Sequence, residues 1–510
     1  MPFPRADSQR TRMISPSGPK NMKKLHKELK RFSAIEAGLA ITGRPAVGIG
    51  LAVVFLGVIW AFTAMTFGQT PSHTFLVLAA VVGGYMALNI GANDVANNMG
   101  PAVGSRAMTM AGALLIAAIC EASGAILAGG DVVETISKGI IDPGAMSDNV
   151  KFVQVMIAAL LASALWVNLA TYLNAPVSTT HAIVGGVMGA GALAAGVGAV
   201  HWSTVGAIVA SWVISPMMGG VIAAALLLFV KKMILFQDDK IAAARRWIPV
   251  LIGLMAGAFG MYLLTKGLAR VYAPPSWLVG LAGVGSFLGV WALMRPIVRR
   301  QTVEMENRRK AVSGLFTHAL IFSSALLSFA HGANDVANAV GPLAAIANAL
   351  AGGGVEDQAV VLPLWILVVG AAGISAGLFL FGPKLIRTVG EKITKLDRAR
   401  AFCVSLSAAV TVLAASGLGL PVSSTHIAVG AVFGVGFLRE ALANHQELSH
   451  LVHPPRLDAI DNPQRVEKLE RRRLVRRQHI TTIGAAWVVT VPLSAALSAG
   501  LYLLLTAFLE

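Results

Sequence analysis

Two short motifs each place one carboxylate and two amide side chains within one or two turns of an apolar helix. The segment GANDVANNMGP occupies residues 91–101, and GANDVANAVGP occupies residues 332–342. The two asparagines of each motif are four residues apart and share a helix face, with the aspartate beside that face. Carboxylate and amide oxygens are hard ligands that suit Na⁺, and a carboxylate can also carry a proton. We therefore expect coupling-cation positions at Asn93, Asp94, Asn97, Asn334, Asp335 and Asn338, with Na⁺ a candidate at Asp94 and Asp335.

Two other motifs carry hydroxyl groups after a proline that interrupts an apolar segment. They read APVSTTH at 175–181 and LPVSSTH at 420–426. Serine after the break favours a helix start, and such a start exposes free N–H groups and the positive end of the helix dipole. We predict an oxyanion site at mid-membrane, as in transporters with broken helices. Its expected residues are Ser178, Thr179, Thr180, Ser423, Ser424 and Thr425, with Asp94 and Asp335 facing the anion.

The charges within these motifs indicate which anion is bound and what accompanies it. The motifs contain neither lysine nor arginine, so a bound anion needs positive charge from a co-bound cation, which favours symport. Sulfate carries no proton at neutral pH and is repelled by a carboxylate, whereas hydrogen phosphate can donate an O–H to one. Phosphate is therefore favoured. A cation or proton on each aspartate would remove the repulsion, so sulfate stays open as an alternative.

Two further polar residues lie in apolar runs. Glu121 is the only acid within 107–128, and we include it among the coupling-ion candidates, against the alternative of a structural acid. His331 directly precedes the second GAND motif, but its counterpart in the first copy is Ile90. We therefore do not expect His331 to be a ligand that the two copies share.

The composition indicates an integral membrane protein. The 510 residues are 55% hydrophobic and 13% charged, with a mean hydropathy of +0.70, whereas soluble domains carry about 25% charged residues. Two cysteines in apolar runs exclude a disulfide framework. The HExxH motif of zinc hydrolases is absent. We expect no enzymatic activity and no bound cofactor beyond the co-transported ion.

The motifs reveal an internal repeat. The GAND motifs recur at an offset of 241 residues and the hydroxyl motifs at an offset of 245, so two copies of one unit follow each other. We divide the chain into a basic cytoplasmic arm (1–44), an additional helix (45–73), transport repeat 1 (74–230), a linker with two transmembrane helices (231–312) and transport repeat 2 (313–510), which contains a cytoplasmic insertion at 439–481.

The distribution of charge indicates that the two copies cross the membrane in opposite senses. Nearly all of the 41 lysines and arginines lie in five polar stretches, as expected for cytoplasmic loops, which argues against a nucleic-acid partner. Loop 129–151 is mainly acidic, whereas its counterpart 383–400 is mainly basic. We predict an all-α polytopic membrane protein with about 11–13 transmembrane segments. It has two inverted-topology repeats with broken helices or re-entrant hairpins, a cytoplasmic N-terminus and an external C-terminus.

The twin motifs resemble those of the inorganic phosphate transporter family, which includes low-affinity phosphate permeases and sodium- or proton-coupled phosphate symporters. The resemblance covers both repeats and implies hairpins that carry the hydroxyl motif around a central phosphate beside coupling ions. It also implies a glutamate after the first motif, here Glu121. The sequence departs from the family pattern at Asn98, where a small residue is usual, and at Ser424, where threonine is commoner.

We therefore predict a secondary active transporter that imports inorganic phosphate by alternating access, coupled to H⁺ or Na⁺. Its expected partners are phosphate, the coupling cation and the lipid bilayer, and a homodimer stays open. We place it in the inner cell membrane as a multi-pass protein. The alternatives are a sulfate or other oxyanion permease of the same family, or an uncoupled anion channel.

Overall fold

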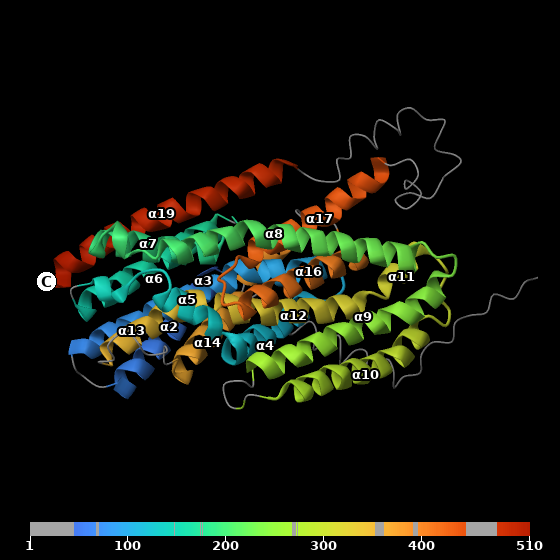
Figure 1. Cartoon of the computed structure of the whole chain (residues 1–510), viewed down its shortest axis with the longest axis horizontal. Helices are drawn as coiled ribbons and strands as arrows, with labels where there is room; N and C mark the ends of the chain where they lie inside the picture. Colours follow the sequence, from blue (N-terminus) through green and yellow to red (C-terminus); the bar gives the residue numbers. More distant parts are fainter. Residues whose placement is uncertain are drawn as a thin grey trace, which may run out of the picture.

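A computed structural model of the chain is helical throughout the residues that it describes, apart from one isolated bridge between Ile141 and Val200 (Figure 1). Eleven helices in these residues are long and apolar enough to cross a membrane, or up to twelve if one bent pair counts as a span. This confirms the predicted all-α polytopic class. The structure describes residues 45–67, 71–146, 148–173, 175, 177–267, 272, 274–351, 362–390, 396–444 and 477–509.

The N-terminal half begins with one helix outside the repeat and continues with repeat 1. That first helix is α2 (Pro45–Phe67). Repeat 1 contains α3 (Pro71–Gly104), α4 (Met110–Ala128), α5 (Gly130–Lys138), η1 (Pro143–Ala145), α6 (Asn149–Tyr172), α7 (Thr179–Ala195), η2 (Val197–Ala199) and α8 (Trp202–Val230).

The linker contains two long helices that pack against each other, α9 (Lys240–Tyr262) and α10 (Ser276–Gln301). The shorter elements around them are η3 (Lys231–Leu235), η4 (Leu263–Gly267) and α11 (Arg309–Gly314). Repeat 2 contains α12 (Thr317–Asp335), α13 (Ala337–Leu350), α14 (Leu364–Leu380), α15 (Gly382–Thr388), α16 (Arg398–Gly417), α17 (Ser424–Asn444) and α19 (Arg477–Leu509).

Two of the predicted segments lie wholly or partly outside the residues that the structure describes. The arm 1–44 lies outside them. The helices extend into both ends of the predicted insertion 439–481, because α17 continues to Asn444 and α19 begins at Arg477. The residues between these two helices also lie outside the described part.

Each repeat contains a hairpin whose tip carries a hydroxyl motif. The ends of the α6–α7 hairpin lie together, because Ile141 pairs with Val200 and His201 N donates to the Ile140 carbonyl at 3.0 Å. Since α6 and α7 also pack along each other, this hairpin enters and leaves on one side. Helices α16 and α17 form the second packed pair. Both serines cap the following helix as predicted: Ser178 Oγ accepts from His181 N, and Ser423 Oγ accepts from His426 N.

The two repeats interleave at closely packed glycines. A Cβ atom on Gly91 of α3 would lie 2.0 Å from the Ile374 carbonyl oxygen of α14. A Cβ atom on Gly332 of α12 would lie 2.0 Å from the Glu121 carbonyl oxygen of α4. Each GAND helix therefore packs against a helix of the other repeat, an approach that only a glycine allows. Helix α7 likewise packs on α19, and α17 packs on α8. This exchange brings both GAND motifs and both hairpin tips to one place.

Candidate functional site

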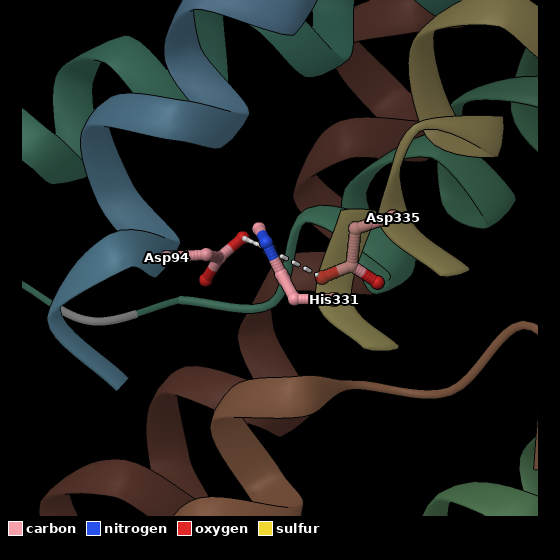
Figure 2. Close-up of side chains that lie close together, drawn as sticks. All are labelled: Asp94, His331 and Asp335. Carbon is pink, nitrogen blue, oxygen red and sulfur yellow. Dashed lines mark ion pairs between the residues drawn. The ribbon is translucent and has the colours of Figure 1, made fainter. Parts of the chain in front are cut away.

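Two buried aspartates, one from each repeat, face a common space. Figure 2 shows Asp94 of α3 and Asp335 of α12 on opposite sides of the His331 ring. Each aspartate is only 1% exposed. His331 Nε2 lies 2.9 Å from Asp335 Oδ2 and 3.8 Å from Asp94 Oδ2. The structure thus brings together the two carboxylates that the repeat predicted, with an unexpected imidazole between them.

Hydroxyl groups from both hairpin tips donate to these carboxylates. Thr179 Oγ1 donates to Asp94 Oδ2 at 3.1 Å, and Ser424 Oγ donates to Asp335 Oδ2 at 3.0 Å. These are equivalent contacts, because Thr179 and Ser424 are 245 residues apart. Thr425 Oγ1 adds a second hydrogen bond to Asp94, to Oδ1 at 2.9 Å. Three of the six hydroxyls predicted to bind the anion therefore donate to the acids in this structure.

Two of the amides connect the repeats to each other. Asn97 Nδ2 donates to Thr425 Oγ1 at 2.7 Å, and Asn338 Nδ2 donates to Thr180 Oγ1 at 3.1 Å. In each pair the amide comes from one repeat and the hydroxyl from the tip of the other. A further bond joins the tips directly, from Thr180 Oγ1 to the Val422 carbonyl at 3.0 Å.

The first asparagine of each GAND motif holds the hairpin of its own repeat. Asn93 Nδ2 donates to Thr171 Oγ1 at 2.9 Å, and Asn334 Nδ2 donates to Ser416 Oγ at 2.9 Å. Asn334 Nδ2 also donates to the Leu420 carbonyl at 3.1 Å, and its Oδ1 accepts from Val422 N at 3.2 Å. The –NH₂ group of each residue therefore positions a tip, a role that sequence reasoning did not assign. Cation ligation by these residues stays a prediction.

Several buried oxygens at the site have no hydrogen-bond donor among the described residues. Buried polar groups are nearly always paired, so an orphaned acceptor suggests a water or ion that belongs there. Both carbonyl-type and carboxylate oxygens can offer a lone pair to a hard cation. The unpaired oxygen atoms are Asn93 Oδ1, Asn98 Oδ1, Glu121 Oε2, Asp335 Oδ1 and Asn338 Oδ1.

His331 is the central residue that sequence reasoning missed. Its exclusion as a shared ligand was based on Ile90, but the structure places its ring between both aspartates. One signal was available: His331 precedes Asp335 by four residues, which places the two on the same face of a buried helix. Asp94, His331 and Asp335 each offer one ligand atom. These three atoms lie within 4.8 Å of one another, which is a geometry that could hold a cation.

Glu121 lies directly behind the imidazole. Its Oε2 is 3.3 Å from His331 Nδ1, and its Oε1 accepts from Asn98 Nδ2 at 2.8 Å. All three side chains are 0% exposed. The predicted coupling-ion candidate thus contacts the site through His331, and its partner Asn98 is the position that departs from the family pattern.

Comparisons with known proteins agree with the motifs. Residues 90–498 match the phosphate transporter family. A Helicobacter pylori protein named as a phosphate permease is 45% identical, over 95% of this chain and 99% of that protein. A Pyrococcus abyssi protein named likewise is 40% identical, over 73% of this chain and 91% of that protein.

One solved structure, described as the sodium-dependent phosphate transporter, has a similar fold. It aligns with a TM-score of 0.73 and 38% identity, covering 85% of this chain and 99% of that one. The family match spans both repeats, and the relatives are similar along most of their length. The chain therefore belongs to the phosphate transporter family.

Proposed function

We propose that this multi-pass membrane protein imports inorganic phosphate by symport with H⁺ or Na⁺, through alternating access. The family and the names of the relatives support phosphate as the substrate and a transporter rather than an enzyme. Within the site, one observation carries the proposal. Hydroxyl groups from both hairpin tips donate to two buried carboxylates, Asp94 and Asp335.

This arrangement explains why a cation and the anion would travel together. While Thr179, Ser424 and Thr425 donate to carboxylates, their hydrogens are not directed at an oxyanion. A cation or proton on Asp94 or Asp335 removes the charge that attracts them. The hydroxyls then turn to phosphate, and the N–H groups at the starts of α7 and α17, which have no partner within the helix, add further donors. Cation binding thereby prepares the anion site, and by linkage phosphate binding strengthens cation binding.

Access to the site requires that a hairpin tip move. Asp94, Asp335 and the tip residues that carry hydroxyls are at most 3% exposed. A surface pocket of about 610 Å³ reaches the α16–α17 connection, with Thr135, Lys266 and Gly419 among its lining residues. There Thr135 Oγ1 donates to the Gly419 carbonyl at 2.7 Å, and Lys266 Nζ donates to the Gly417 carbonyl at 3.1 Å. Opening on this side must break both bonds, so we assign the pocket to one of the two access routes.

The membrane orientation also belongs to the proposal. We place the chain in the inner cell membrane, with the N-terminus in the cytoplasm and the C-terminus outside. The basic stretches of the sequence support this orientation. Protease accessibility of a tag on each terminus, in intact cells and in inverted vesicles, tests it. Cleavage of both tags from the same side would contradict the inverted repeat.

Labelled phosphate uptake into proteoliposomes tests the function. We expect uptake to depend on an inward Na⁺ or H⁺ gradient and to resist excess unlabelled sulfate. Asp94→Asn and Asp335→Asn should each abolish uptake while still inserting into the membrane. The matched control is Asp238→Asn, at an exposed aspartate between η3 and α9. Uptake that ignores both gradients would indicate a channel, and competition by sulfate would indicate a broader oxyanion permease.

A further inference from the structure

Four basic side chains gather where η3, α11, α16 and α17 meet. Figure 1 shows the ends of α8 and α9 beside α11, and η3 continues α8 directly. Each of the four elements supplies one cation, and all four cations fall in the basic stretches that the proposed orientation places in the cytoplasm. We call this set the basic cluster; it consists of Lys231, Arg309, Arg400 and Arg439.

Lys231 is a buried cation without a counter-ion. It is only 7% exposed, and its Nζ lies 5.9 Å from the centre of the Phe236 ring. No acid or hydrogen-bond acceptor among the described residues contacts that nitrogen. Lysines are almost never fully buried unless they are paired, because a buried charge without a partner is costly. The surroundings of Lys231 therefore call for an anion.

The neighbours of Lys231 add positive charge instead of removing it. Arg309 Cζ lies 4.0 Å from the centre of the same aromatic ring. Arg439 and Arg400 also lie within electrostatic range of Lys231. The acid that acts on this group is Asp397, but its Oδ2 already accepts from Arg400 Nε at 2.7 Å and its Oδ1 caps α16. One occupied carboxylate thus faces four cations in the described part of the chain.

Exposed apolar side chains lead up to the basic cluster along the packed pair α8 and α17. Leu228 precedes Lys231 by three residues and is 40% exposed, and Phe437 precedes Arg439 by two residues and is 47% exposed. A free anion needs no such surface. A phospholipid does, because its acyl chains must lie against apolar side chains on the membrane side of its headgroup.

We propose that the basic cluster binds the phosphate of an anionic phospholipid headgroup. Guanidinium groups stay charged and bind phosphate oxygens in pairs, and basic pockets between transmembrane helices are suited to such headgroups. The phosphate supplies the anion that Lys231 lacks. Since Arg439 and the second hydroxyl tip belong to one helix, α17, the lipid holds the far end of a helix that reaches the transport site. This inference does not rest on the proposed transport cycle.

Thermal unfolding of the full chain in mixed micelles tests the site. Phosphatidylcholine micelles would be titrated with phosphatidylglycerol, which should raise the melting temperature of the unmodified protein. We expect Lys231→Met to weaken the apparent affinity for phosphatidylglycerol about tenfold, as for a lost hydrogen bond to a charged group. Arg309→Gln and Arg439→Gln should each weaken it about fivefold. The matched control is Lys232→Met, which removes the same charge from the next residue, an exposed one, and should weaken it less than about twofold.

A second readout separates headgroup binding from a general loss of stability. In phosphatidylcholine alone, Lys231→Met should melt at the same temperature as the unmodified protein or higher, because it removes a buried charge that has no partner. With saturating phosphatidylglycerol the order should reverse. A lower melting temperature of Lys231→Met in phosphatidylcholine alone would overturn the inference, because Lys231 would then already be stabilised by the protein.

Two further outcomes would also overturn the lipid site. Equal loss of affinity in Lys231→Met and Lys232→Met would mean that phosphatidylglycerol responds only to net charge. Inorganic phosphate in phosphatidylcholine micelles is the other arm. If it stabilised the protein as much as the lipid does, with the effect lost in Lys231→Met and retained in Asp94→Asn, the ligand would be free phosphate. Neither measurement involves transport, so a failure of phosphate uptake would leave this result unchanged.

Discussion

The two repeats make matching contacts around the hairpin tips and different contacts behind the aspartates. Asn97 and Asn338 each cross to the tip of the other repeat, and Thr179 and Ser424 each donate to the aspartate of their own repeat. Behind Asp335 lie His331 and Glu121, whereas the equivalent positions of the other repeat are Ile90 and Ile374. The matched contacts hold the tips, which a mechanism that opens to either side needs twice. The contacts that differ involve the charged side chains. The two aspartates share one central site, so these contacts are needed only once.

The largest expected effect tests the shared packing. Gly91→Ala and Gly332→Ala each direct a Cβ into a main-chain oxygen 2.0 Å away. We expect both variants to lose about 3 kcal/mol or more of stability, which for a membrane protein means little monodisperse material. Yield and thermal stability after purification measure this loss. Gly50→Ala, on α2 with no atom within 4 Å of the added carbon, is the control. A strong defect at only one of the two sites would show that the repeats are not packed equivalently.

A second prediction concerns the amides that cross between the repeats. Asn97→Ala and Asn338→Ala each remove a hydrogen bond to a threonine hydroxyl at a tip. Uptake should fall about tenfold in each, and by a similar factor. Initial rates of labelled phosphate uptake provide the measurement. Asn348→Ala is the control on the same helix as Asn338, because its Nδ2 donates within that helix to the Ala344 carbonyl. Tolerance of both site variants would exclude a role for the crossed pairs.

The threonines at the tips offer a prediction that sharpens the comparison. Thr425 and Thr180 are equivalent residues, yet Thr425 donates to Asp94 while Thr180 donates to the Val422 carbonyl. Thr425→Val removes a bond that stabilises the cation-free Asp94 carboxylate, so it should lower the cation concentration for half-maximal uptake about fivefold relative to Thr180→Val. Cation titrations of uptake at saturating phosphate compare the two variants. Equal shifts would mean that the hydroxyl–carboxylate bond does not influence cation binding.

The smallest effect is expected at the surface pocket. Lys266 Nζ lies 2.5 Å from Asp131 Oδ2, and the two side chains are 32% and 44% exposed. Exposed ion pairs contribute little and are screened by salt. Lys266→Met and Asp131→Asn should thus change uptake by at most about fivefold, with the difference from the unmodified protein shrinking at high salt. Glu306→Gln, in the exposed pair with Arg308, is the control. A complete loss of uptake would give this pair a larger role than access to the tip.

The helical class and the pairing of the motifs could be predicted, because hydropathy and internal repetition can be read directly from the sequence. Apolar length indicated the spans, and the repeated GAND and hydroxyl segments indicated which residues meet. The role of Asn93 and Asn334 in holding the hairpins was not predictable, because the carbonyls and hydroxyls that they contact become neighbours only after folding.

His331 was missed for a different reason. The repeat was used as a filter, so a residue without an equivalent was set aside, although the centre of a two-fold site can be occupied by one side chain from one copy. The interleaving of the repeats could not be predicted from the sequence either. It depends on how closely Gly91 and Gly332 approach helices of the other repeat, which hydropathy does not encode.

Phosphate binding to the purified protein tests the central claim most directly, because it needs no gradient and no movement of the carrier. Isothermal titration of phosphate would be carried out with Na⁺ or an inert organic cation, each across a range of pH. The account predicts that Na⁺ or added protons tighten phosphate binding to the unmodified protein, and that Asp94→Asn and Asp335→Asn abolish this dependence. Phosphate affinity that is the same with and without Na⁺ at every pH would contradict the account.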